Sequence, residues 1–240
     1  NVLKQTGHLD AAIDSYKLAL KIRPDFVDVH NNMAIVLQDR GELEAAIESY
    51  KRALEIKPDY VEAYINMGVA LKDKGELCSS IESYQQALKI KPDYAEAYCN
   101  MGVSLEEKGD LNLAIDSFVK ALNIRPNLIE AASQLAKLPR EYIGGRELDL
   151  LKETLKNQKF DQQNASDIQF IEANILRHEG DADAAFEKFF SANEIKAKSL
   201  KILMPSGNYR NNFYINRLVD WTPQLASKKV SPLKKVFILG

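Results

Sequence analysis

A pattern that returns every 34 residues constrains this fold most strongly. Four prolines and four glycines each keep that spacing, at Pro24, Pro58, Pro92 and Pro126 and at Gly7, Gly41, Gly75 and Gly109. Self-similarity at this period is typical of helix-turn-helix solenoids, in which no single unit buries its own apolar face. The period therefore predicts an all-α array in which each unit packs on its neighbours.

The unit from Val61 to Tyr94 shows how each copy is built. Its first apolar stripe recurs at three- and four-residue spacing, as on one face of a helix, through Tyr64, Met67, Gly68 and Leu71. Gly75 ends this helix. A second stripe runs from Leu77 to Ile90, and Pro92 stops it because proline cannot continue a helix. The small residues Gly68 and Ala87 are expected where the paired helices cross closely.

These positions resemble the tetratricopeptide repeat (TPR) family. The matching positions are the large fourth (His30, Tyr64, Tyr98), the small eighth (Ala34, Gly68, Gly102), the twentieth (Ala12, Ala46, Ser80, Ala114), the aromatic twenty-fourth (Tyr16, Tyr50, Tyr84, Phe118) and the proline. The resemblance implies an all-α TPR solenoid wound into a right-handed superhelix. It also implies a concave surface, lined by the first helix of each unit, on which such proteins hold extended peptides.

The repeat divides the chain into a regular array and a degenerate region. We expect a partial repeat over residues 1–26, with a turn at Gly7. Full repeats follow over 27–60, 61–94 and 95–128, and a capping helix over 129–138 ends before Pro139. A degenerate helical region is expected over 139–219, with one weak unit turning at Gly180. A linker over 220–235 and a short apolar strand over 236–240 complete the prediction.

The C-terminal part resembles a second group, the bacterial proteins in which TPRs precede a sulfotransferase domain. The resemblance rests on Phe189, Phe190, Ala192 and Asn193, followed by a helix, a linker and an apolar strand. In that group the strand runs into a Gly-x-Pro-Arg-Ser-Gly loop that binds the sulfate donor PAPS, and Gly240 could be its first residue. The resemblance implies a PAPS-dependent parent enzyme, whereas residues 1–240 alone should bind no cofactor. The alternatives are a stand-alone TPR adaptor and the TPR region of a glycosyltransferase.

Composition and charge argue against several classes of function. No apolar run is long enough to span a bilayer, and Cys78 and Cys99 are the only cysteines, as expected for free thiols in the cytoplasm. The segment from Lys196 onward contains nine basic residues and one acidic residue, Asp220. It has no nucleic-acid recognition motif. The three histidines lack metal-ligand spacing, and no catalytic motif is present. We therefore expect no nucleic-acid partner, no membrane partner, no metal and no catalytic residue.

The best candidate for binding is a ladder of asparagines at the sixth position of each repeat: Asn32, Asn66 and Asn100. A carboxamide both donates and accepts hydrogen bonds, so a row of them can hold successive peptide groups of an extended chain. The TPR superhelix of O-linked N-acetylglucosamine transferase is similar in having such a ladder. Asparagine is also the usual TPR residue at this position, so a purely structural role is the alternative.

Carboxylates flank the ladder on both sides. They occupy the second position (Asp28, Glu62, Glu96) and the thirteenth (Asp39, Asp73, Glu107), which also face the concave side. TPR proteins that clamp a terminal carboxylate place Lys and Arg at these positions instead. The pattern predicts a preference for neutral or basic extended peptides of a partner protein, unless these carboxylates are only a solvated helix surface.

Overall fold

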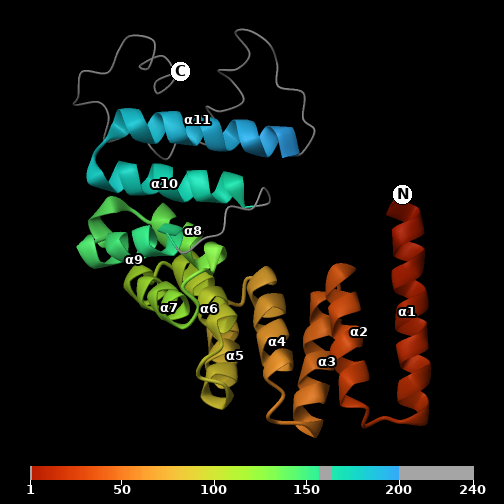
Figure 1. The fold of residues 1–240 in the computed structure, drawn as a ribbon. Helices are drawn as coiled ribbons and strands as arrows, with labels where there is room; N and C mark the ends of the chain where they lie inside the picture. Colours follow the sequence, from red (N-terminus) through yellow and green to blue (C-terminus); the bar gives the residue numbers. More distant parts are fainter. Residues whose placement is uncertain (1, 157–163, 200–240) are drawn as a thin grey trace.

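The computed structural model describes residues 2–156 and 164–199, and within these ranges every regular element is a helix (Figure 1). The all-α helical array predicted from the period is therefore confirmed for the described residues. The linker at 220–235 and the strand at 236–240 lie outside the described residues, as does Gly240.

Three helix pairs form the regular part of the array. α2 (Val27–Asp39) pairs with α3 (Leu43–Ile56), α4 (Val61–Asp73) with α5 (Leu77–Ile90), and α6 (Ala95–Lys108) with α7 (Leu111–Ile124). α8 (Ile129–Lys137) follows, and Pro139 then precedes a short 3₁₀ helix, η1 (Arg140–Tyr142). Beyond it lie α9 (Gly145–Lys156) and a last pair, α10 (Ala165–Glu179) and α11 (Ala182–Ser199).

Glycine sets the turn inside each pair because the chain there needs a positive φ. Gly75 has φ +86°, in the left-handed region that favours glycine. Its amide donates to the carbonyl of Lys72 at 2.8 Å, and the amide of Glu76 donates to that of Leu71 at 2.8 Å. These two bonds form the Schellman motif that ends helices. Gly41, Gly109 and Gly180 repeat the positive φ, so the weak unit predicted around Gly180 has the same turn.

Small residues let an aromatic ring pack directly on a neighbouring helix. Tyr50, Tyr84 and Phe118, at the twenty-fourth position, are fully buried. A Cβ added at Gly68 would lie 2.6 Å from Tyr84 Cε1, and one added at Gly102 would lie 2.6 Å from Phe118 Cε1. Ala87 is also fully buried. The close crossings expected at Gly68 and Ala87 are therefore present.

The turn predicted at Gly7 is wrong. α1 (Val2–Ile22) is a single helix that runs through Gly7, which is not among the glycines with positive φ. Continuing the helix through Gly7 keeps the backbone hydrogen bonds of this segment within one element. Near the C-terminal end of α1, Leu18 and Ile22 are 60% and 81% exposed.

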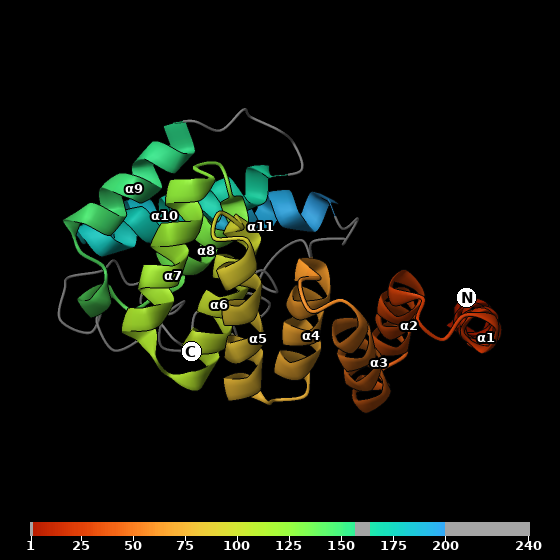
Figure 2. The same ribbon diagram turned by 90° about the horizontal axis from the view of Figure 1, so that it is seen from below.

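The helices form a curved stack. α1 to α5 stand side by side in sequence order, whereas α10 and α11 run across their direction at the far end (Figure 1). The same order is visible from below, with α7 to α11 gathered at the end opposite α1 (Figure 2). The first helices α2, α4, α6 and α8 contact one another in succession, which places their equivalent positions along one surface.

Candidate peptide-binding surface

The asparagines of neighbouring first helices are linked by hydrogen bonds. Asn66 Nδ2 of α4 donates to Asn31 Oδ1 of α2 at 3.3 Å, and Asn31 Nδ2 donates to Asn32 Oδ1 at 3.4 Å. Asn31 is only 5% exposed, whereas Asn32 is exposed and Asn66 half-buried. The fifth and sixth positions of α2 and the sixth position of α4 therefore form a continuous carboxamide row across two repeats.

The row extends beyond the three predicted asparagines. Asn100 of α6 is half-buried, and its side chain has no hydrogen-bond partner among the described residues. Gln134 occupies the same repeat position on α8, and its Oε1 accepts a hydrogen bond from Lys137 Nζ at 3.4 Å. Sequence reasoning missed Asn31 and Gln134, although one further 34-residue step from Asn100 leads to Gln134.

At the N-terminal ends of the first helices, two of three predicted carboxylates have partners. The Tyr60 hydroxyl donates to Asp28 Oδ1 at 3.2 Å, and Glu96 forms an ion pair with Arg125. Burial opposes ionisation of Glu96, but hydrogen bonds from Arg125 and from its own backbone amide hold its pKa below the usual value. Glu62 has no such partner in the described part and is exposed.

At the C-terminal ends, Lys72 lies among the carboxylates. Its Nζ is 3.1 Å from Asp73 Oδ1 and 3.8 Å from Glu107 Oε1, and Gln38 Nε2 donates to Asp73 Oδ2 at 3.1 Å. Asp39 is exposed and has no ion-pair partner in the described ranges. Four of the six predicted carboxylates are thus already hydrogen-bonded or ion-paired, and the surface is less acidic than its sequence suggests.

Within the described residues we find no group of metal-binding side chains, and no helix there could cross a membrane. Cys99 is buried, and burial raises the pKa of its thiol to about 12, so the thiol is protonated at neutral pH. Cys78 is a second free thiol, on the surface of α5. The groups that the first helices present to a ligand are thus the carboxamides of the row and carboxylates whose charge is partly neutralised.

The comparisons with known proteins agree with this architecture. No curated protein matches the chain. Among solved structures, PilF of Pseudomonas aeruginosa has 20% sequence identity and a TM-score of 0.61, covering 82% of this chain and 89% of that one. YrrB, described as a TPR protein with an unusual peptide-binding site, has 20% identity, coverages of 80% and 100%, and a TM-score of 0.57. MamA has 24% identity, coverages of 82% and 94%, and a TM-score of 0.52. At these identities the similarity concerns the fold.

Family profiles account for the array itself. The profile described as "TPR repeat" matches residues 1–39, 36–75 and 70–109, and the one described as "Tetratricopeptide repeat" matches residues 95–128. The matches together span residues 1–128, more than half of the chain, and include every glycine-turned pair from α2 to α7. The chain belongs to the tetratricopeptide repeat family.

Proposed function

We propose that the first helices α2, α4, α6 and α8 bind an extended peptide of a partner protein. The observation that carries this proposal is the carboxamide row, in which Asn66 reaches Asn31 across two repeats. A row at repeat spacing can hydrogen-bond successive peptide groups without selecting side chains. YrrB, which shares the fold, is described as having a peptide-binding site. A protein-interaction scaffold is thus the function that fold and surface support best.

The remaining charge favours neutral or basic peptides. Asp39 and Glu62 are free to attract a cation, whereas Asp28, Asp73, Glu96 and Glu107 are partly satisfied. Because such exposed charges are screened by salt, we propose that they add a modest preference to binding that the amides supply. We further propose that the protein works in the cytoplasm, because Cys78 and Cys99 are free thiols, as is usual in a reducing compartment.

The test combines a peptide array with alanine variants. Extended twelve-residue peptides of equal apolar content, in neutral, basic and acidic sets, are screened, and the best binder is titrated. The triple variant Asn32→Ala, Asn66→Ala, Asn100→Ala should bind it roughly tenfold to a thousandfold more weakly, because each lost amide contact is worth about 0.5–1.5 kcal/mol. Asn66→Ala also removes the donor to buried Asn31, so titrations are done well below the melting midpoint.

The control is a pair of alanine substitutions at exposed asparagines of α7, Asn112 and Asn123, which lie on a second helix. This control should bind the peptide as tightly as the wild type. Equal binding by the triple variant would show that the asparagines are only structural TPR residues. A preference for the acidic peptides would contradict the proposed role of the carboxylates.

A downstream PAPS-dependent sulfotransferase domain is a separate proposal that rests on sequence resemblance alone. In α11, Asn193 Nδ2 donates to the Phe189 carbonyl at 3.0 Å, and the Phe189 ring lies 6.1 Å from that of Phe170. These contacts show that Phe189 and Asn193 of the resembling motif pack within the last helix pair, a role that does not require a downstream enzyme domain. Reading the coding sequence past Gly240 tests the proposal. The Gly-x-Pro-Arg-Ser-Gly loop would support it, and a glycosyltransferase domain or a stop codon would replace it with one of the alternatives.

A further inference from the structure

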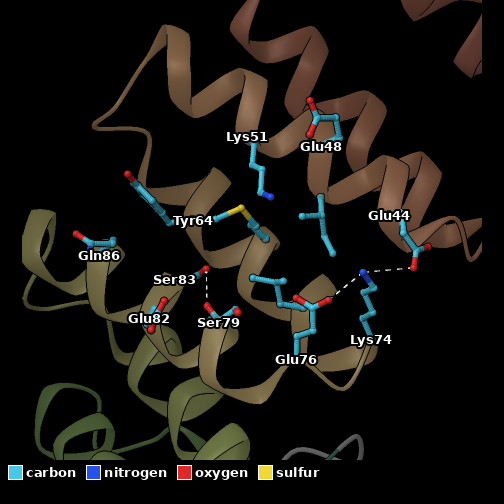
Figure 3. Close-up of a pocket in the computed structure, with 13 residues that line it drawn as sticks. Glu44, Glu48, Lys51, Tyr64, Lys74, Glu76, Ser79, Glu82, Ser83 and Gln86 are labelled. Atoms are coloured by element: carbon cyan, nitrogen blue, oxygen red, sulfur yellow. Dashed lines mark hydrogen bonds and ion pairs between the residues drawn. The ribbon is translucent and has the colours of Figure 1, made fainter.

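A pocket of about 440 Å³ opens between the second helices α3 and α5 (Figure 3). Tyr64, Met67 and Leu71 of α4 form its floor, and Ile47 of α3 adds to the apolar surface. Successive helical residues turn by about 100°, so these three α4 side chains point roughly 100° to 160° away from Asn66. We call this pocket the α3–α5 trough. It is distinct from the carboxamide row.

Two positions that line the trough carry different residues in the next repeat. Ser79 and Gln86 of α5 line it, whereas one repeat later the same positions carry Leu113 and Lys120. Lys120 Nζ lies over the Tyr98 ring, 5.6 Å from its centre. Among the described residues, no cation lies over the ring of Tyr64, the equivalent of Tyr98, in this way. The α5 side chains at these two positions are thus shorter and uncharged, and the half-buried Tyr64 and Met67 line the trough beside them.

The walls of the trough are mainly acidic. Four glutamates line it, Glu44, Glu48, Glu76 and Glu82, against two lysines, Lys51 and Lys74. Lys74 closes one end, with Nζ 3.4 Å from Glu44 Oε1 and 2.9 Å from Glu76 Oε1 (Figure 3). Glu48 is 3.5 Å from Arg52. Glu82 is exposed and has no ion-pair partner within the described ranges, so its carboxylate can receive a cation from a ligand.

We propose that the α3–α5 trough is a second docking site, for a basic segment of a partner protein in which an apolar residue stands next to lysine or arginine. The apolar side chain covers the half-buried Tyr64 and Met67, and removing their remaining apolar surface from water favours binding. The neighbouring cation meets Glu82, the lining glutamate that has no ion-pair partner within the described ranges. Since the site lies behind the carboxamide row, a partner bound here leaves the first helices free for a peptide.

Methionine methyl NMR can test this directly. The chain contains four methionines, of which Met33, Met67 and Met101 hold the same position in successive repeats. Of these three, Met67 is the one that lines the trough. The probe is the blocked peptide Gly-Lys-Leu-Phe-Lys-Gly, titrated into protein labelled with ¹³C at the methionine methyl groups. We expect a saturable shift of the Met67 signal, assigned from a Met67→Leu variant, while Met33 and Met101 stay unchanged.

Matched variants separate the trough from general effects. Ser79→Leu introduces the residue of the next repeat and should abolish the Met67 shift without unfolding the chain. Glu82→Lys should weaken binding by roughly threefold to tenfold, as expected for an exposed charge pair. Asp116→Lys makes the same change one repeat later and should have little effect. A peptide with glutamate in place of lysine should bind more weakly than the lysine probe.

Several outcomes would overturn the proposal. These are an unchanged Met67 signal at millimolar probe, an equal shift in the Ser79→Leu variant, or equal weakening by Asp116→Lys and Glu82→Lys. The triple asparagine variant should show the wild-type Met67 shift. Failure of the carboxamide row and failure of the trough are therefore distinguishable in the same set of proteins.

Discussion

At the scale of single residues, the side chain at the twelfth repeat position has different surroundings in each repeat. Gln38 donates to Asp73 and accepts from the Tyr50 hydroxyl at 3.4 Å. Lys72 is ion-paired with two carboxylates. Glu106 is half-buried and has no hydrogen-bond partner in the described part. Burial, with a contribution from Glu107, raises the pKa of Glu106, although Lys137 acts in the opposite direction.

We therefore expect Glu106→Gln to stabilise the chain at neutral pH, by up to about 1 kcal/mol. The raised pKa means that the folded state binds a proton more tightly than the unfolded state. Stability is therefore lost as pH rises from the ordinary value of 4.5 through the folded pKa. The gain from glutamine should disappear below pH 4.5, where the carboxyl is protonated in both states.

Denaturant unfolding of Glu106→Gln at several pH values checks this expectation. Glu107→Gln is the control, because Glu107 is exposed and lies 3.8 Å from Lys72. That variant should show no gain at neutral pH. A stabilisation of Glu106→Gln that persists unchanged at low pH would mean that the effect does not come from the titration of Glu106.

At the scale of helices, glycine and proline spacing was enough to predict every pair from α2 to α7. It was enough because both act locally: glycine supplies the positive φ of the turn, and proline stops the second helix. Gly7 shows the limit of this reasoning. A glycine permits a turn but does not impose one, and α1 continues through it. Whether the turn forms depends on a packing partner, which the local sequence does not reveal.

The buried face of α5 gives a test of the assigned repeat register. Ala87 is fully buried, as are Ala53 and Ala121 at the same position of neighbouring repeats. We expect Ala87→Leu to lower the free energy of unfolding by about 1–3 kcal/mol, because the added carbons must displace closely packed neighbours. Chemical denaturation measures the loss. Ala45→Leu, at an exposed position of α3, should cost much less, and equal losses would place Ala87 outside a tight crossing.

At the scale of the whole molecule, sequence predicted which positions share a surface but not which of them bind one another. The 34-residue period places Asn32, Asn66 and Asn100 in register. The bond from Asn66 to Asn31, the position of Lys72 between two carboxylates, and the α3–α5 trough all depend on how neighbouring repeats pack. Serine at position 79 is unremarkable in a single sequence. The structure places it in one pocket with Tyr64 and Met67.

The joint between the regular array and the last helix pair also depends on packing. α8 stops before Pro139, which leaves its last carbonyls without helical partners. Arg177 of α10 reaches them: its Nη2 lies 3.2 Å from the carbonyl oxygens of Ala136, Lys137 and Leu138. His178 Nε2 is 2.9 Å from the same Ala136 oxygen. The end of one helix is thus capped by side chains of another.

We expect Arg177→Ala to loosen this joint and leave the rest of the array intact. Hydrogen bonds to a charged group contribute about 1.5–3 kcal/mol, and the freed carbonyls stay partly buried. Because each repeat packs mainly on its neighbours, the loss should remain local. Amide hydrogen exchange should therefore become faster in α10 and α11 but not in α2 to α5. Arg146→Ala, at an exposed site of α9, should exchange like wild type, and faster exchange throughout the array after Arg177→Ala would show that the joint stabilises the whole solenoid.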